Sequence, residues 1–224
     1  MIYYIADMHF GHTNVLRFDN RPFPDTAQMD DTLIQNWNER VTSEDTVYVL
    51  GDAFWKNEEN SIQIMERLRG HKHLIQGNHD RVKGKLRPYW EGIEQYAEVN
   101  DENRLVILSH YPILFYKNQH YGAVMLYGHV HNTREWELVE KWKKEQWAMG
   151  IPSRLIAGLR FIVFLTASNA IHKDGISSLK YGPRGGLRSF ARPTHRTSHI
   201  DLADCTKSCI RLCVFRGRIG FCEF

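Results

Sequence analysis

The chain has 224 residues, of which 42% are hydrophobic and 25% are charged. This composition is ordinary for a soluble globular protein, and the length suffices for one sizeable domain with or without an appendage. The formal net charge of +3 hides an uneven distribution, because residues 1–150 hold 17 basic and 22 acidic residues whereas residues 151–224 hold 12 and 4. The two parts are therefore net −5 and net +8, and we expect them to differ in character.

The sequence predicts a cytoplasmic protein without a membrane anchor. Residues 1–7 contain no basic region and few apolar residues, which argues against a signal peptide. The longest apolar run, residues 161–167, is far too short to cross a bilayer. All four cysteines lie within the last 20 residues, so we expect no disulfide in the main body, as in a reducing compartment.

Apolar runs and capping residues predict alternating strands and helices along the first 150 residues. Asp25, with a glutamine three residues on, has the pattern of a helix N-cap, and apolar residues in 29–41 recur at helical spacing. Asn60 is predicted to cap a second helix that ends at Gly70, and residues 134–149 are predicted to form an exposed helix. Five short strands are predicted at residues 2–6, 46–50, 74–75, 105–108 and 124–127.

Each predicted strand is followed at once by a cluster of Asp, Asn or His residues. In α/β sheets the carboxyl ends of the strands meet at the ligand site, so we expect these side chains to converge. No local structure explains them, since they are spread over residues 7–131. The clusters are Asp7-Met8-His9, Gly51-Asp52, Gly77-Asn78-His79-Asp80, Ser109-His110 and Gly128-His129-Val130-His131.

The converging groups have the chemistry of a metal site. Three carboxylate or amide side chains and four imidazoles are too many for one ion, whereas two ions about 3.5–4 Å apart with a shared carboxylate use them well. Oxygen and imidazole ligands without a thiolate suit Mn, Fe, Zn, Co or Ni, among which we favour Mn. Asp52 is the expected bridge, because the preceding glycine lets its carboxylate approach closely. The expected ligands are Asp7, His9, Asp52, Asn78, His110, His129 and His131.

In their order, these motifs resemble the calcineurin-like metallophosphoesterases over roughly residues 1–150. The resemblance implies a four-layer α/β/β/α sandwich, which we place at residues 1–157. By the same resemblance His79 is not a ligand but the proton donor, oriented by Asp80. The opening Asp-x-His-Phe-Gly-His is similar to a small bacterial and phage branch of the family, which places His12 near the metals. The implied ligand sets are Asp7, His9, Asp52 and His131 for one ion, and Asp52, Asn78, His110 and His129 for the other.

The resemblance and the chemistry of the residues together predict a phosphoric ester hydrolase. Two cations lower the pKa of a shared water, so a hydroxide that attacks phosphorus exists at neutral pH. A histidine tuned by a neighbouring carboxylate can then protonate the leaving oxygen. Phosphomonoester and phosphodiester substrates fit equally, a nucleotide or nucleic acid is suggested by analogy alone, and the oligomeric state is not readable. The alternative is a scaffold of the same fold that binds partner proteins, but such scaffolds tend to lack the proton donor that His79 supplies here.

Some residues allow two interpretations. His12 either contacts a substrate phosphate or supports the metal ligands from behind. Arg17, Arg21 and Arg81 could hold phosphate, but we favour solvated surface arginines. Three tryptophans within residues 134–149 recur roughly at helical spacing, which indicates packing first and a docking face second.

Residues 158–224 are predicted to form an atypical basic tail, and the family resemblance stops after residue 156. The abrupt change of composition favours a shifted reading frame or a fusion junction, and hence a poorly ordered tail. Two other interpretations are a basic arm that binds nucleic acid and a zinc site that combines His195 and His199 with cysteines. The spacing of four between Cys205, Cys209 and Cys213 would stack these side chains on one helix face.

Overall fold

The computed structural model describes residues 1–131, 133–157, 212–215 and 218–221, the last two ranges as backbone. The elements up to residue 157 belong to one compact unit, and the two strands after residue 211 belong to another. In chain order the elements are β1 (Ile2–Ile5), α1 (Thr13–Phe18), α2 (Thr26–Arg40), β2 (Thr46–Val49), α3 (Glu58–Arg67), β3 (His71–Ile75), the 3-10 helix η1 (Gly84–Tyr89), β4 (Gly92–Glu94), β5 (Tyr96–Asp101), β6 (Arg104–Ser109), the 3-10 helix η2 (Gln119–Tyr121), β7 (Val124–Tyr127), α4 (Arg134–Ala148), β8 (Leu155–Ala157), β9 (Leu212–Phe215) and β10 (Arg218–Phe221).

The helices begin at side chains that accept hydrogen bonds from the first turn. Asp25 caps α2, since its carboxylate accepts from the Gln28 backbone N–H at 2.8 Å, which confirms the predicted cap. Asn57 rather than Asn60 caps α3: the Asn57 side chain accepts from the Asn60 backbone N–H at 3.0 Å. The predicted cap residue therefore lies inside the helix, which starts one turn earlier than the sequence pattern indicated.

Two four-stranded sheets form the centre of the first unit. One sheet has the order β1-β2-β3-β4 with all neighbours parallel. The other has the order β5-β6-β7-β8, in which β5 is antiparallel to β6 and the remaining pairs are parallel. All five predicted strands are present. The sequence patterns did not indicate β4, β5 and β8, because β4 and β8 have three residues each and β5 exposes every second side chain.

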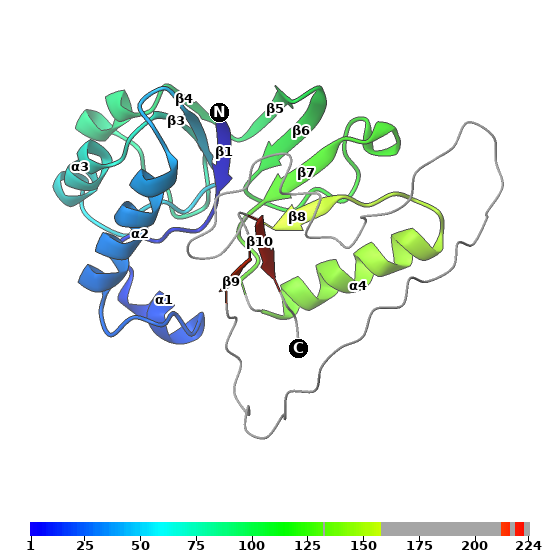
Figure 1. Cartoon of the computed structure of the whole chain (residues 1–224), viewed down its shortest axis with the longest axis horizontal. Coiled ribbons are helices and arrows are strands. Elements are labelled where there is room, and N and C mark those ends of the chain that lie inside the picture. Colours follow the sequence, from blue (N-terminus) through cyan, green and yellow to red (C-terminus); the bar gives the residue numbers. More distant parts are fainter. Residues whose placement is uncertain (132, 158–211, 216–217, 222–224) are drawn as a thin grey trace, which may run out of the picture. The chain divides into compact units, whose positions relative to one another are not determined.

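The elements pack through three separate apolar cores into four layers. The first core joins one face of β1–β4 to α1, α2 and α3, with Val47, Val49 and Leu74 pointing towards the helices. The second lies between the two sheets and contains Leu50, Ile75 and Leu126 among others. The third joins the far face of β6–β8 to α4. Figure 1 shows α2 and α3 beside the first sheet and α4 beside the second. This α/β/β/α arrangement confirms the predicted fold class.

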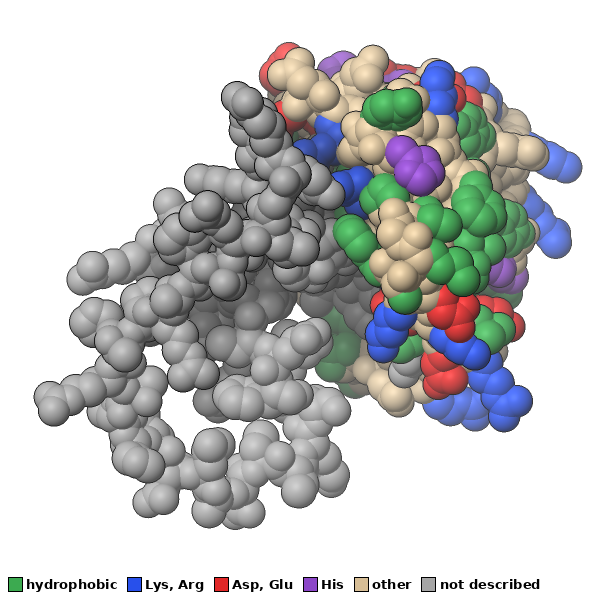
Figure 2. All heavy atoms as spheres, turned by 90° about the vertical axis from the view of Figure 1, so that its right-hand side faces the viewer, with side chains coloured by type: hydrophobic (Ala, Val, Ile, Leu, Met, Phe, Trp, Pro, Cys, Tyr) green, Lys and Arg blue, Asp and Glu red, His purple; other side chains and the backbone are tan. Residues whose placement is uncertain are grey.

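Helix α4 packs one side against the second sheet and exposes several apolar side chains on the other. Trp136 and Trp142 pack against the third core, as predicted for this helix, whereas Leu138, Trp147 and Met149 are exposed. The face of the molecule in Figure 2 likewise shows hydrophobic side chains beside Lys, Arg, Asp and Glu side chains. Among the described helices none combines the length and the apolarity needed to cross a bilayer.

The described part of the predicted tail is a hairpin. Strands β9 and β10 pair antiparallel, with Phe215 opposite Arg218 and Leu212 opposite Phe221. Cys213 thus lies on a strand, so the helical stacking predicted for it with Cys205 and Cys209 does not form at this residue. The other predictions for the tail, including a zinc site or a poorly ordered segment, concern residues outside the described ranges.

We predict that the core between the sheets contributes strongly to the stability of the first unit. Leu126 is fully buried there, and Leu126→Ala should lower the free energy of unfolding by about 2–5 kcal/mol, because it removes buried methyl groups and leaves a cavity. Leu138 is 64% exposed on α4, so Leu138→Ala is a matched control that should change stability by less than about 0.5 kcal/mol. Urea unfolding followed by circular dichroism measures both changes, and equal effects would contradict this assignment of the core.

Candidate metal centre and active site

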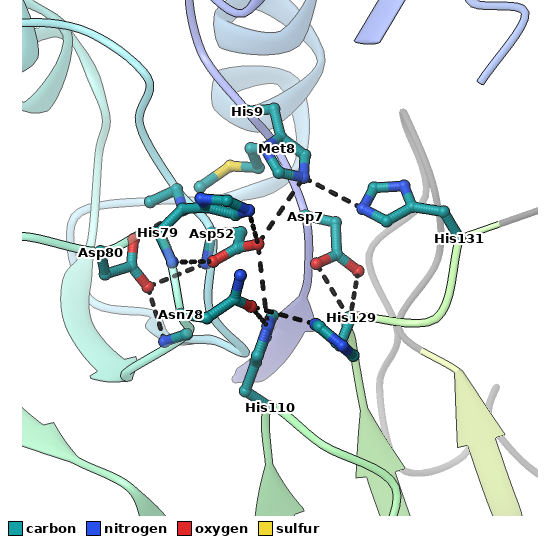
Figure 3. Close-up of polar contacts among 12 residues, drawn as sticks. Asp7, Met8, His9, Asp52, Asn78, His79, Asp80, His110, His129 and His131 are labelled. Carbon is teal, nitrogen blue, oxygen red and sulfur yellow. Dashed lines mark hydrogen bonds and ion pairs between the residues drawn. The ribbon is translucent and has the colours of Figure 1, made fainter. Parts of the chain in front are cut away.

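The polar clusters that follow the strands lie together in the structure. Figure 3 shows the side chains of Asp7 and His9 after β1, Asp52 after β2, and Asn78 and His79 after β3, all pointing towards those that follow β6 and β7. His110 follows β6, and His129 and His131 follow β7. Residues separated by up to 122 positions are thereby in contact, as between His9 and His131. The convergence that the sequence predicted is therefore present, and both sheets contribute to it.

The backbone at these residues is held in an uncommon conformation. Asp7, His9, Asp52 and His129 have φ values of 52°, 53°, 52° and 68°, in the left-handed region that non-glycine residues seldom adopt. Each such residue costs about 1–3 kcal/mol and persists only where the surrounding structure enforces it. Four of the eight non-glycine residues with positive φ in the described chain are thus candidate ligands, which marks the cluster as a functional site.

Two glycines are required because other atoms approach their backbone closely. A Cβ atom on Gly51 would lie 2.2 Å from Nδ1 of His110, and one on Gly77 would lie 2.3 Å from Oδ1 of Asp52. No side chain fits at either position. Gly51 also has a φ of 86°. The two glycines therefore let the loops after β2 and β3 and the His110 ring meet around one carboxylate.

Asp7, His9 and His131 form the first group that can hold a cation. One ligand atom from each lies within 4.8 Å of the others, and Nε2 of His9 is 3.1 Å from Nε2 of His131. Nδ1 of His131 is 2.9 Å and 3.0 Å from the two carboxylate oxygens of Asp19, to which it donates its proton. Because Nδ1 carries the proton of the neutral His131 ring, Nε2 keeps a lone pair that points into the cluster. Metal-bound histidines commonly have this arrangement, in which the other ring nitrogen donates to a carboxylate.

A second group surrounds His110. Its Nδ1 donates to the Leu50 carbonyl at 2.9 Å, so Nε2 of the neutral ring is an acceptor. This Nε2 faces Oδ1 of Asn78 at 2.9 Å, and Oδ1 is also 3.0 Å from Nδ1 of His129. An imidazole lone pair and an amide oxygen that face each other, here with the imidazole buried, are satisfied by a cation. Asp7, Asp52 and His110 also bring ligand atoms within 4.8 Å of one another.

The Asp52 carboxylate lies between the two groups. Its Oδ2 is 3.9 Å from Nε2 of His9 and 3.7 Å from Nε2 of His110, and the residue is 2% exposed. Its Oδ1 accepts the backbone N–H of His79 at 2.9 Å. One oxygen is thus fixed by the loop after β3, while the other remains between imidazoles from both groups.

Burial controls the protonation of the ligands. Burial and the neighbouring His131 lower the pKa of His9 to about 2, so its ring is neutral and can coordinate. Burial raises the pKa of Asp7 to about 6, which a cation in the cluster would reverse. Burial also lowers the pKa of His129. For His131 burial acts in the same direction, but the hydrogen bond to Asp19 and the negative charges of Asp7 and Asp19 together outweigh it, and the pKa is raised.

Asp80 has a different contact from the one predicted. Its two carboxylate oxygens accept the backbone N–H groups of Asp52, Ala53 and Gly77 at 2.8 Å, 2.9 Å and 2.8 Å. These are its side-chain hydrogen bonds in the described part of the chain, so Asp80 does not orient the His79 ring directly. It instead joins the loop after β2 to the loop after β3, which are the two loops that carry Asp52 and Asn78.

The loop after α1 contains two residues whose roles the sequence did not indicate. Asp19 holds His131, as described above. Arg21 is 4% exposed and donates to the backbone carbonyls of Asp7 and Met8, both at 2.8 Å, and to Asp19 at 3.3 Å. The prediction of a solvated surface arginine was therefore wrong for Arg21, because its guanidinium is the support of the left-handed segment 7–9. Pro22 and the spacing of two between Asp19 and Arg21 were the only signals in the sequence.

His12 and His79 lie at the edge of the cluster. His12 is buried, and its ring stacks on that of Trp55 with centroids 4.0 Å apart and planes 9° apart. His79 has 40% of its side chain exposed, its Nε2 is 4.0 Å from Oδ2 of Asp52, and its ring centroid is 4.5 Å from that of Trp55. His79 is thus the histidine of the cluster that solvent and a ligand can reach most readily.

Comparisons with known proteins identify the family. The model of the calcineurin-like phosphoesterase family matches residues 1–173, so the chain belongs to this family. The match extends beyond residue 156, where the resemblance was expected to stop. The family binds divalent metals and cleaves phosphate esters, which agrees with the Asp and His groups described above.

Three relatives show how far the similarity extends. An uncharacterized protein of Methanocaldococcus jannaschii is 43% identical over 88 residues, which are 38% of this chain and 50% of that protein. The Gene 66 protein of Mycobacterium phage D29 is 27% identical over 160 residues, covering 58% of this chain and 78% of its own. A solved structure of a protein of unknown function from Aquifex aeolicus is 29% identical, with a TM-score of 0.50, over 60% of this chain and 81% of its own. The chain therefore spans only half the length of the archaeal relative.

We predict that Asp19 sets the affinity of the first ligand group for a divalent ion. Asp19→Ala should weaken Mn²⁺ binding about 100-fold and Asp19→Asn about tenfold, because the His131 ring loses the carboxylate that orients and polarises it. Isothermal titration calorimetry of the metal-stripped protein measures both. Asp31→Asn is a matched control, since this carboxylate is 67% exposed and pairs with Arg67. Unchanged affinity in a folded Asp19→Ala protein would refute the role.

Proposed function

We propose that the protein is a dinuclear metal-dependent hydrolase that cleaves phosphomonoesters or phosphodiesters. The observation that carries this proposal is the position of Asp52, whose Oδ2 lies 3.9 Å from a His9 nitrogen and 3.7 Å from a His110 nitrogen. A single carboxylate oxygen between two sets of ligands supports a bridged pair of ions rather than one ion. Membership of the calcineurin-like phosphoesterase family supports the chemistry.

The chain offers each ion a set of nitrogen and oxygen ligands. Asp52 belongs to both sets, and the absence of a thiolate among the described candidates suits Mn²⁺ better than a structural zinc. When bound, two such ions would supply positive charge to the phosphoryl oxygens and lower the pKa of a water. The first set is Asp7, His9, Asp52 and His131, and the second is Asp52, Asn78, His110 and His129.

His79 is the residue we assign to proton transfer. Its backbone N–H is bound by Asp52 at 2.9 Å, which fixes its distance from the ligands, while its ring is 40% exposed and bonded to no ligand atom in the described chain. A proton on its Nε2 can pass to the leaving oxygen of an ester that lies beside the ligand cluster. Asp80 supports this geometry through the loop backbone. His12, buried against Trp55, supports the site from behind rather than reaching the substrate.

A scaffold that binds partner proteins is the competing function. The full set of seven ligands and the accessible His79 support an enzyme, because a scaffold has no need of a reachable proton donor. We place the enzyme in the cytoplasm, since residues 1–157 contain no cysteine that a secreted protein could use for a disulfide. We assign the activity to residues 1–157, which hold every proposed site residue.

We predict that His79→Asn slows hydrolysis in a manner that depends on the leaving group. With a methyl or other alkyl ester in Mn²⁺ buffer, kcat should fall by about 10²–10⁴, because the alkoxide needs the proton that His79 gives. With a p-nitrophenyl ester the loss should be much smaller, since nitrophenolate leaves without a proton. Steady-state kinetics of both esters, with a chelator as the blank, measure the difference.

His120→Asn is the control for this experiment, because His120 is exposed and lies on η2 outside the cluster. Equal losses on the alkyl and the aryl ester would contradict the acid role of His79. Metal-loaded wild-type protein that hydrolyses neither ester would favour the scaffold.

A further inference from the structure

A cavity of about 480 Å³ opens beside the metal centre, on the side of His79. Its volume is in the range of sites that hold small organic ligands of nucleotide size. The side chains that matter for its chemistry are Trp55, Lys56, Asn78, His79, Arg81 and Lys83. None of the seven proposed ligands except Asn78 contributes to the wall, so the cavity is an extension of the site and not the metal pocket itself.

The cavity meets the metal centre at Asn78 and His79. Oδ1 of Asn78 is 2.9 Å from the His110 ring and 3.0 Å from the His129 ring, and both Asn78 and His79 line the cavity. An ester whose phosphorus lies at the ligand cluster and whose leaving group occupies the cavity therefore has its ester oxygen beside His79. Since His79 is the proposed proton donor, the occupant is the leaving group of the substrate, and this inference rests on the proposed function.

Trp55 provides the cavity with a prearranged aromatic surface. Its ring is 46% exposed, yet it is fixed by the stacked His12 ring, and its backbone N–H donates to the Phe10 carbonyl at 2.9 Å. A large ring held in place with nearly half its surface open to solvent costs free energy unless a ligand covers it. The ligand that matches it is planar and apolar on its faces, such as a nucleobase.

The cavity also carries positive charge that the described protein leaves unpaired. Arg81 and Lys83 are exposed, and neither has an ion pair or a side-chain hydrogen bond within the described residues. The other charged groups of the wall are already engaged: Lys56 pairs with Asp30 at 3.2 Å, Glu58 accepts the Leu86 N–H at 3.1 Å, and Asp80 accepts three backbone amides. Arg81 and Lys83 are thus the charged side chains of the wall without a partner among the described residues, and their cationic groups suit a second phosphate beyond the ring.

We propose that the cavity binds the leaving nucleoside of a single-stranded oligonucleotide, with its base against Trp55 and its next phosphate held by Arg81 and Lys83. Hydrolysis then breaks the P–O bond to this nucleoside, a water adds its oxygen to phosphorus, and one proton goes to the leaving oxygen. The substrate is accordingly a phosphodiester with at least one further phosphate, and neither a monoester nor a diester with small uncharged groups uses the whole site.

Three substrates separate the parts of this proposal: trithymidylate, dithymidylate without a further phosphate, and bis(p-nitrophenyl) phosphate. Wild-type protein in Mn²⁺ should have a higher kcat/KM for trithymidylate than for dithymidylate. Arg81→Ser combined with Lys83→Ser should lower kcat/KM for trithymidylate about tenfold more than for bis(p-nitrophenyl) phosphate, because only the former carries the second phosphate. Trp55→Ala should lower kcat/KM for both thymidylates about tenfold, and Trp55→Phe should restore most of it.

Lys85→Ser is the matched control, because this exposed lysine lies on η1 between the same loops but does not line the cavity. It should leave the preference for trithymidylate unchanged. Two results would overturn the proposal for the cavity while the proposed function stands. In the first, the protein hydrolyses bis(p-nitrophenyl) phosphate but does not prefer trithymidylate to dithymidylate. In the second, the double variant loses kcat/KM equally on trithymidylate and bis(p-nitrophenyl) phosphate.

Binding gives a second readout that does not need turnover. Fluorescence anisotropy of labelled hexathymidylate should show binding that weakens about tenfold in the double variant, with a salt slope reduced by about 0.7 for the lost phosphate contact. Lys85→Ser should bind like the wild type. No binding, or equal weakening by both variants, would overturn the proposal, and binding without any ester hydrolysis would instead overturn only the proposed enzyme.

Discussion

A buried lone pair that faces another acceptor requires positive charge between them, and the centre of this protein depends on that constraint. Nε2 of His110 faces Oδ1 of Asn78 at 2.9 Å, and in the neutral ring this nitrogen is an acceptor, because the Nδ1 proton is donated to the Leu50 carbonyl. Leu50 directly follows β2 and precedes Gly51 and Asp52, so the same segment that presents the Asp52 carboxylate also fixes the histidine opposite it. The carbonyl that follows β2 therefore sets the tautomer in which His110 can coordinate a cation through Nε2.

The surrounding sheets and helices keep the backbone of the candidate ligands in its uncommon conformation. Four candidate ligands have left-handed backbone, which costs about 1–3 kcal/mol each and would revert in a loose loop. Two buried side chains prevent it: Arg21 donates to the carbonyls of segment 7–8, and Asp80 accepts three amides from the loops after β2 and β3. The three apolar cores hold the strand ends from which these loops leave. Stability of the fold and strain at the site are thus linked.

The sequence predicted the parts of this architecture that are local. Apolar runs that end in polar clusters indicated five strands and every proposed ligand, because strand and cluster are adjacent in the chain. Strand β5 could not be predicted from an apolar run because it has no continuous one. The start of α3 differs from the prediction because Asn57 and Asn60 both have the side chain of a helix cap. The roles of Asp19, Arg21 and Asp80 could not be predicted, because each depends on a partner that only the folded chain supplies, such as His131, 112 residues from Asp19.

The most direct test of a dinuclear metal centre is a crystal structure of the Mn²⁺-loaded protein with anomalous scattering measured from the manganese. We predict two peaks about 3.5–4 Å apart on either side of the Asp52 carboxylate, one beside His9 and His131 and the other beside His110 and His129. A single peak, or peaks that leave Asn78 and His110 facing each other without an ion, would contradict it.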